Sequence, residues 1–198
     1  MATQPFTEAL QNPANVTQVQ TNSQTWLREQ LQNFNNASNP QTLLRNSSNQ
    51  KENRLVSKLM IGRMYLFYYD PKTKEELPYY DRFPLIFPFN RVDDGFYGIN
   101  MHYLPHVLRA RLMDNLYNLA NNTKNDDTTR LRLSYEILNA SSRYKYFKPC
   151  VKHYLNSHVR SRFLWIPADQ WKTALFLPLE RFAKASKNKV WQDSRRLV

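Results

Sequence analysis

Residues 68–89 read YYDPKTKEELPYYDRFPLIFPF, and this stretch decides the fold. It combines aromatic residues, prolines and a charged DPKTKEE turn, which is typical of short strands joined by a turn. A second unusual string, GFYGINMHYLP, occupies residues 95–105. Together the two strings predict a compact β unit with a specific surface. Neither contains a recognisable catalytic motif.

Three strands are expected around these strings. Residues 63–69 and 83–89 are rich in aromatic residues, and residues 96–103 follow an Asp-Asp-Gly turn. Pro84 and Pro88 cannot donate to a ladder, so we expect the second strand at a sheet edge or interrupted by bulges. The expected arrangement is a small antiparallel β meander of three or four strands, or a partial barrel.

After residue 105 the apolar period becomes helical. Apolar residues at three- and four-residue steps predict a helix from there to the Asn pair at 121–122. Further helices are expected from about residue 127, with an apolar face of Leu131, Tyr135 and Leu138, and over residues 149–159 and 167–177. Strands followed by helices indicate the α+β class. Residues 51–198 are thus interpreted as a basic α+β domain, β-rich over 60–104 and helix-rich over 105–198.

Residues 1–50 differ in composition from the rest of the chain. Eighteen of these residues are Asn or Gln, and their four charges cancel. Such a polar segment cannot bury enough apolar surface to order itself, so it is interpreted as an N-terminal arm. Its helically spaced apolar cluster predicts a short amphipathic helix at residues 25–35 that folds on a neighbouring subunit, through Trp26, Leu27, Leu31 and Phe34. The alternative is a plain disordered tail.

Net charge gives the clearest indication of a partner. The chain has 28 Lys and Arg against 16 Asp and Glu, a net charge of +12, all of it in residues 51–198. This surplus predicts binding to double-stranded DNA or DNA ends, although basic residues also serve solubility or an acidic protein neighbour. Candidate phosphate-binding cations in the acid-free stretch 143–162 are Arg143, Lys145, Lys148, Lys152, Arg160 and Arg162. Tyr144 and Tyr146 are candidates for stacking on unpaired bases.

A second group of cations closes the chain. It comprises Arg181, Lys184, Lys187, Lys189, Arg195 and Arg196, opposed in that stretch only by Asp193. These cations are a further candidate for DNA contact. Arg109 and Arg111 flank the apolar face of the helix expected after residue 105, where we expect them mainly to keep that helix soluble.

Metal sites have little support in the sequence. Cys150, His153 and His158 lie within nine residues, and His102 and His106 are four apart. A structural zinc site needs four ligands, however, and Cys150 is most simply a small buried residue. We therefore expect no metal and no cofactor.

A nuclease would need clustered carboxylates to hold magnesium. The candidates are Asp70, Glu75, Glu76, Asp81, Asp93 and Asp94. Most of them fall in expected turns, where acids solvate the loop. The chain also has only three glycines and no G-x-S-x-G string, so a phosphate-binding loop and a nucleophile elbow are absent from the sequence. The sequence thus predicts a protein that is not an enzyme and has no small-molecule substrate.

Cysteine content and hydropathy limit the setting. The single cysteine excludes an intramolecular disulfide, so an intracellular setting is expected. The sequence contains no run of 18 apolar residues and does not begin like a signal peptide, so no membrane partner is expected.

Several strings resemble a family of small proteins from T4-like tailed bacteriophages. They are IGRMYLFYYDPKTKEELPYYDRFPLIFPF, DDGFYGINMHYLP, RARLMDNLY, YKYFKPCVKHYL and ALFLPLERF, spread over about residues 60–198. The resemblance implies a DNA end protector, a virion component that sits on the packaged DNA terminus and shields it from host exonuclease. The competing role is a structural subunit of the phage tail, baseplate or neck, held to other virion subunits by the arm. Both roles imply the virion, and the host cytoplasm during assembly.

Overall fold

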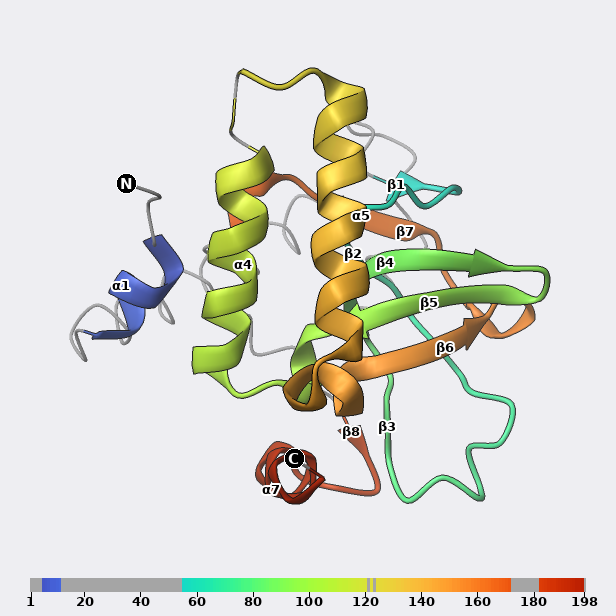
Figure 1. The fold of residues 1–198 in the computed structure, drawn as a ribbon. Coiled ribbons are helices and arrows are strands. Elements are labelled where there is room, and N and C mark those ends of the chain that lie inside the picture. Colours follow the sequence, from blue (N-terminus) through green and yellow to red (C-terminus); the bar gives the residue numbers. More distant parts are fainter. Residues whose placement is uncertain (1–4, 12–54, 121, 123, 172–181, 198) are drawn as a thin grey trace, which may run out of the picture.

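The computed structural model describes residues 5–11, 55–120, 122, 124–171 and 182–197 (Figure 1). This part of the chain has the predicted α+β class. Its helices are α1 (Pro5–Gln11), α4 (His106–Ala120), α5 (Asp127–Arg143) and α7 (Lys187–Arg196), with 3-10 turns η1 (Met101–Tyr103), η2 (Lys145–Cys150), η3 (Asn156–His158) and η4 (Ala168–Gln170). Its strands are β1 (Leu55–Val56), β2 (Met64–Leu66), β3 (Tyr80–Asp81), β4 (Leu85–Val92), β5 (Gly95–Asn100), β6 (Val151–Leu155), β7 (Phe163–Ile166) and β8 (Phe182–Ala183). No helix among these described residues is long and apolar enough to cross a membrane.

Six strands form one antiparallel sheet in the order β1-β7-β2-β4-β5-β6, and β3 pairs with β8. The three strands expected from the aromatic strings are present as β2, β4 and β5. The expectation that prolines place the second of them at an edge is wrong, because β4 lies between β2 and β5. The alternative of a bulge is confirmed, since the β4–β5 register shifts between Pro88 and Asn90.

The sheet is larger than the predicted meander because the carboxy-terminal half supplies β6 and β7. The helix expected over residues 149–159 is therefore wrong. That segment forms the end of η2, then β6, which pairs with β5, and then η3. Gly95 permits this pairing at the start of β5, where a Cβ atom would lie 2.0 Å from the Tyr154 carbonyl oxygen.

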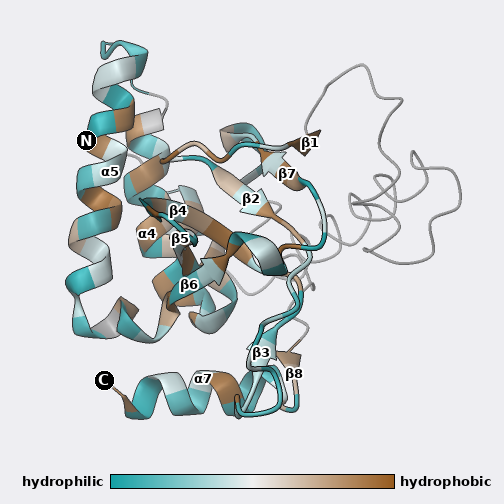
Figure 2. Cartoon of the chain, turned by 90° about the vertical axis from the view of Figure 1, so that its right-hand side faces the viewer, coloured by the Kyte–Doolittle hydropathy of each residue, from teal (hydrophilic) through white to brown (hydrophobic). Residues whose placement is uncertain are grey.

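Helices α4 and α5 cover one face of the sheet (Figures 1 and 2). Helix α4 is the one predicted by the apolar period, and its Leu112, Met113 and Leu116 side chains are buried in the main core. Helix α5 is less buried than predicted: Leu138 joins the core, but Leu131 and Tyr135 are more than one-third exposed.

The opposite face of the sheet carries a second, aromatic core. Phe67 lies at its centre. The centroid of its ring is 5.2 Å from that of Phe163 and 5.3 Å from that of Tyr154, and both ring pairs are edge-on. Alternate residues along the strands therefore fill two cores, as expected for a sheet buried on both faces.

Helix α1 packs against α4 and contributes to the main core. The Phe6 ring is 1% exposed and contacts Tyr117 edge-on at 5.6 Å. The buried Asp114 carboxylate of α4 accepts from the backbone N–H groups of Phe6 and Thr7 at 2.8 and 3.0 Å. The start of the chain is thus part of the folded body, which its composition did not indicate. The helix expected at residues 25–35 lies outside the described residues, as do Trp26, Leu27, Leu31 and Phe34.

Cys150 should be chemically silent in the folded protein. It is fully buried at the end of η2, and burial raises the pKa of the Cys150 thiol to about 12. A thiol-specific reagent should therefore react at least ~100-fold more slowly with the native protein than with the protein in denaturant, because the thiolate is the reactive form. Timed labelling followed by mass spectrometry measures this ratio. Equal rates would mean that η2 opens readily in the native state.

Candidate nucleic-acid interface

The carboxy-terminal end of α5 carries the most accessible part of the predicted DNA-binding stretch. Arg143 is the last residue of α5, where a cation is favourable next to the helix carbonyl groups. The backbone then turns extended at Tyr144, whose side chain is 63% exposed. Lys145 and Lys148 follow in η2, and both are exposed. The six-residue segment 143–148 therefore presents three exposed cations and an exposed aromatic ring.

Lys152 does not lie on this open surface. It sits near the start of β6, half-buried, with its ammonium 4.1 Å from the centre of the Tyr103 ring. Burial lowers the pKa of the Lys152 ammonium below its ordinary value. Lys152 faces a pocket bounded by the segment between β2 and β3.

Arg160 and Arg162 follow the other end of β6. Both are exposed, and the Arg160 guanidinium donates to the Ser157 carbonyl at 3.2 Å. A strand rises about 3.3 Å per residue, so the five residues of β6 separate its two ends by roughly 16 Å. The predicted stretch is thus divided between the two ends of a strand. Tyr146 lies in η2, and its side chain is outside the described part of the structure.

The second basic group is divided as well. The Lys184 ammonium donates to the carbonyl oxygens of Lys74 and Glu75 at 2.7 and 3.0 Å, so it fastens the segment before β3. Lys189 pairs with Asp193 at 3.0 Å within α7. Arg181 lies outside the described residues, and Lys187 stands 5.6 Å from the Trp191 ring.

Arg195 and Arg196 are exposed at the carboxy-terminal end of α7. This end and the carboxy-terminal end of α5 lie at the same end of the molecule in both views (Figures 1 and 2). The 3-10 turn η1 lies between the two helix ends, because it contacts both α7 and η2, the turn that follows α5. We call the surface formed by Arg143, Tyr144, Lys145, Lys148, Arg195 and Arg196 the basic end. No carboxylate of the described residues forms an ion pair with any of its five cations.

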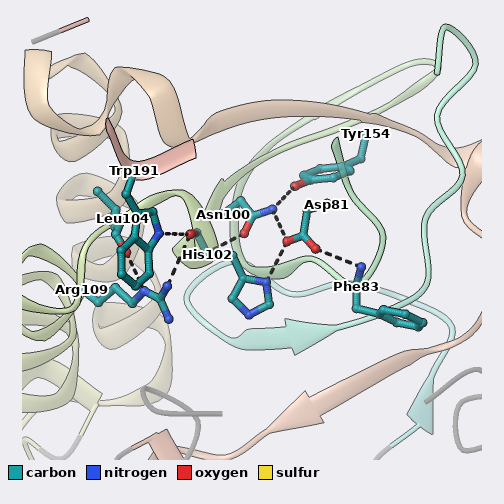
Figure 3. Close-up of polar contacts among 8 residues, drawn as sticks. All are labelled: Asp81, Phe83, Asn100, His102, Leu104, Arg109, Tyr154 and Trp191. Atoms are coloured by element: carbon teal, nitrogen blue, oxygen red, sulfur yellow. Dashed lines mark hydrogen bonds and ion pairs between the residues drawn. The ribbon is translucent and has the colours of Figure 1, made fainter. Parts of the chain in front are cut away.

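A buried polar network supports the basic end from inside (Figure 3). The Asp81 carboxylate, 3% exposed, accepts from the Phe83 backbone N–H at 3.0 Å, from Asn100 Nδ2 at 3.0 Å and from His102 Nδ1 at 2.7 Å. Asn100 Nδ2 also donates to the Tyr154 hydroxyl at 3.0 Å. This network ties together β3, β5, β6 and η1.

The same network holds α7 in place. The Trp191 indole N–H donates to the His102 carbonyl at 2.8 Å, and the Arg109 guanidinium donates to the carbonyls of Leu104 and His102 at 2.7 and 3.3 Å (Figure 3). Arg109 is completely buried, so the expectation that it solubilises the helix is wrong. Its burial is explained by these backbone acceptors, which helical periodicity does not reveal.

Comparison with known proteins identifies the family. Residues 6–195 match the family described as phage T4 terminal DNA protecting protein. The chain belongs to this family. No curated protein and no solved structure matches the chain. The resemblance to a T4-like phage DNA end protector is therefore confirmed. Its expected start near residue 60 is wrong, since the match also includes the Asn/Gln-rich arm.

In this member of the family, the acidic and metal-ligating candidates are dispersed. Within the described ranges no three His, Cys, Asp or Glu residues gather as a metal site. His153 instead pairs with Asp94 at 3.1 Å, and His158 Nδ1 lies 2.8 Å from the Asp70 carbonyl oxygen. The Asp81–His102 pair is buried, with side chains 2% and 0% exposed.

Proposed function

We propose that this protein binds the ends of linear double-stranded phage DNA through the basic end and shields them from exonuclease. The observation that carries the proposal is the placement, at one end of the molecule, of the exposed Tyr144 ring and five cations that form no ion pair with a described carboxylate. The DNA terminus as partner comes from the family, whose description names terminal DNA.

The chemistry of the basic end suits a duplex terminus. Cations that neutralise phosphates release counterions, which gives affinity without sequence readout. A duplex end differs from its interior by exposing the face of a base pair, on which an aromatic ring can stack for about 1–3 kcal/mol. Arg143 and Lys145 flank Tyr144 directly, so stacking and phosphate contact can occur together. Protection then requires occlusion and no catalysis by the protein.

Exonuclease digestion of linear DNA tests this proposal. The wild-type protein should slow digestion, and a covalently closed circle should compete poorly for it. The variant K145E/K148E should lose about tenfold or more in affinity, and its salt slope should fall by about two, because each lost phosphate contact lowers the slope by about one.

The matched control is K124E/R132E, which makes the same change in net charge near the other end of α5. Both control residues are exposed. If the control variant protects DNA as well as the wild type does, binding is assigned to the basic end. If both variants lose protection equally, the loss is explained by the change in net charge alone. Absence of protection by the wild type would contradict end binding and favour a tail, baseplate or neck subunit.

A further inference from the structure

A pocket of about 300 Å³ lies between β6 and the segment before β3, and Tyr103 of η1 also lines it. Its aromatic lining consists of Tyr69, Tyr79, Tyr80, Tyr103 and Tyr154. Its charged lining residues are Lys72, Asp81 and Lys152, and His153 lines it as well. Sites for small molecules span roughly 300–1,000 Å³, so this volume suits one nucleotide and not a length of strand.

Among the described residues, the lysine ammonium groups that line the pocket form no ion pair with the carboxylate that lines it. Asp81 is already occupied by three donors from the protein. The half-buried Lys152 ammonium has the Tyr103 ring as a neighbour, and no described carboxylate forms an ion pair with it. A partly desolvated cation without an anion is costly, so an anionic ligand at Lys152 would offset that cost. Lys72 is exposed and lines the same pocket.

The wall of the pocket is held by several independent hydrogen bonds. Lys184, in a left-handed conformation with φ of 67°, binds the carbonyls of Lys74 and Glu75. The Tyr69 N–H donates to the Arg82 carbonyl at 3.0 Å, and the Asp70 N–H donates to the His158 carbonyl at 3.1 Å. Because these hydrogen bonds hold the segment between β2 and β3, the pocket is formed before a ligand binds. This lowers the entropy cost of ordering that segment on binding.

We propose that this pocket receives the terminal nucleotide of a DNA strand, with a terminal phosphate monoester at Lys152 and the base among the tyrosines. This inference rests on the proposed function. A phosphate monoester carries about −1.5 to −2 charges at neutral pH, whereas an internal diester carries one. An internal nucleotide must leave the stack at a cost of a few kcal/mol, and a terminal nucleotide has one stacking neighbour fewer to lose.

Equilibrium binding of short duplexes tests the inference. The duplexes carry a 5′-phosphate, a 3′-phosphate or only hydroxyl groups at their ends, which also distinguishes the two sources of a monoester. The wild type should bind one phosphorylated duplex about tenfold more tightly than the hydroxyl duplex. K152M should lose that preference and bind all three duplexes with the affinity of the wild type for hydroxyl ends, and K152R should restore the preference.

The control variant K145M lies on the basic end, and it should weaken binding to all three duplexes by the same factor. If K152M does not fold, K72M replaces it, with a reduced preference expected. Calorimetric titration of the full chain with thymidine 5′- and 3′-monophosphates reads out the pocket without DNA, and saturable binding that K152M abolishes is expected.

The possible results separate the two proposals. End protection without any preference for phosphorylated ends, or a preference that survives in K152M, overturns the pocket inference and leaves end binding intact. If the wild-type protein binds no DNA but binds mononucleotides, and K152M abolishes the mononucleotide binding, then end binding is overturned and the pocket remains a nucleotide site.

Discussion

Replacing Asp81 with alanine should lower the free energy of unfolding by about 3–5 kcal/mol, because the buried donors that surround its carboxylate lose their acceptor. The variant leaves His102 Nδ1 and the Phe83 N–H without their carboxylate acceptor, and an unmade hydrogen bond at a buried donor is costly. Chemical denaturation followed by circular dichroism measures the change.

The chain provides a matched control in a second His–Asp pair. His153 and Asp94 lie 3.1 Å apart with their side chains 34% and 65% exposed, whereas His102 and Asp81 are 0% and 2% exposed. Because exposed pairs contribute up to about 1 kcal/mol, Asp94→Ala should change stability by no more than that. Equal losses in the two variants would contradict the assignment of the Asp81 network as the support of η1 and α7.

Phe6→Ala should destabilise the protein by about 3–5 kcal/mol, the usual cost of truncating a fully buried phenylalanine. The ring fills the space between α1 and α4, next to Tyr117, and its loss leaves a cavity. Thermal and denaturant unfolding both report the change.

Glu8→Ala on the exposed side of α1 is the control, and it should stay within about 0.5 kcal/mol of the wild type. The sequence alone suggests that residues 1–50 are dispensable for folding. With Phe6 in the core and Asp114 bound to the start of α1, we instead expect their deletion to destabilise the protein. A Phe6→Ala variant as stable as the wild type would restore the first interpretation.

The local sequence pattern predicted an element correctly where the spacing of its apolar residues matches the side that is buried. The aromatic strings gave β2, β4 and β5, and the apolar residues before position 120 gave α4. Pattern failed at β6, because VKHYL is five residues long and is a strand only by pairing with β5, more than 50 residues earlier. No local period records such a partner.

The candidate site was predictable in composition and not in geometry. Net charge and the family strings indicated DNA, but charge cannot tell an open cation such as Lys148 from Lys152 over a tyrosine ring. The Asp81 network was missed because its members lie 19 and 21 residues apart and meet only after β3, β5 and η1 assemble. Acidic residues in turns are commonly solvated, so nothing in the sequence marked Asp81 as different.

The position of β6 at the rim of the six-stranded sheet also bears on how copies of the protein behave toward each other. Unpaired strand edges invite edge-to-edge addition and aggregation, and proteins limit this with short strands and lysine. Strand β6 is five residues long and carries Lys152 as its second residue, so it offers little backbone to a second copy. The feature that shapes the pocket therefore also favours colloidal stability of this basic protein at high concentration.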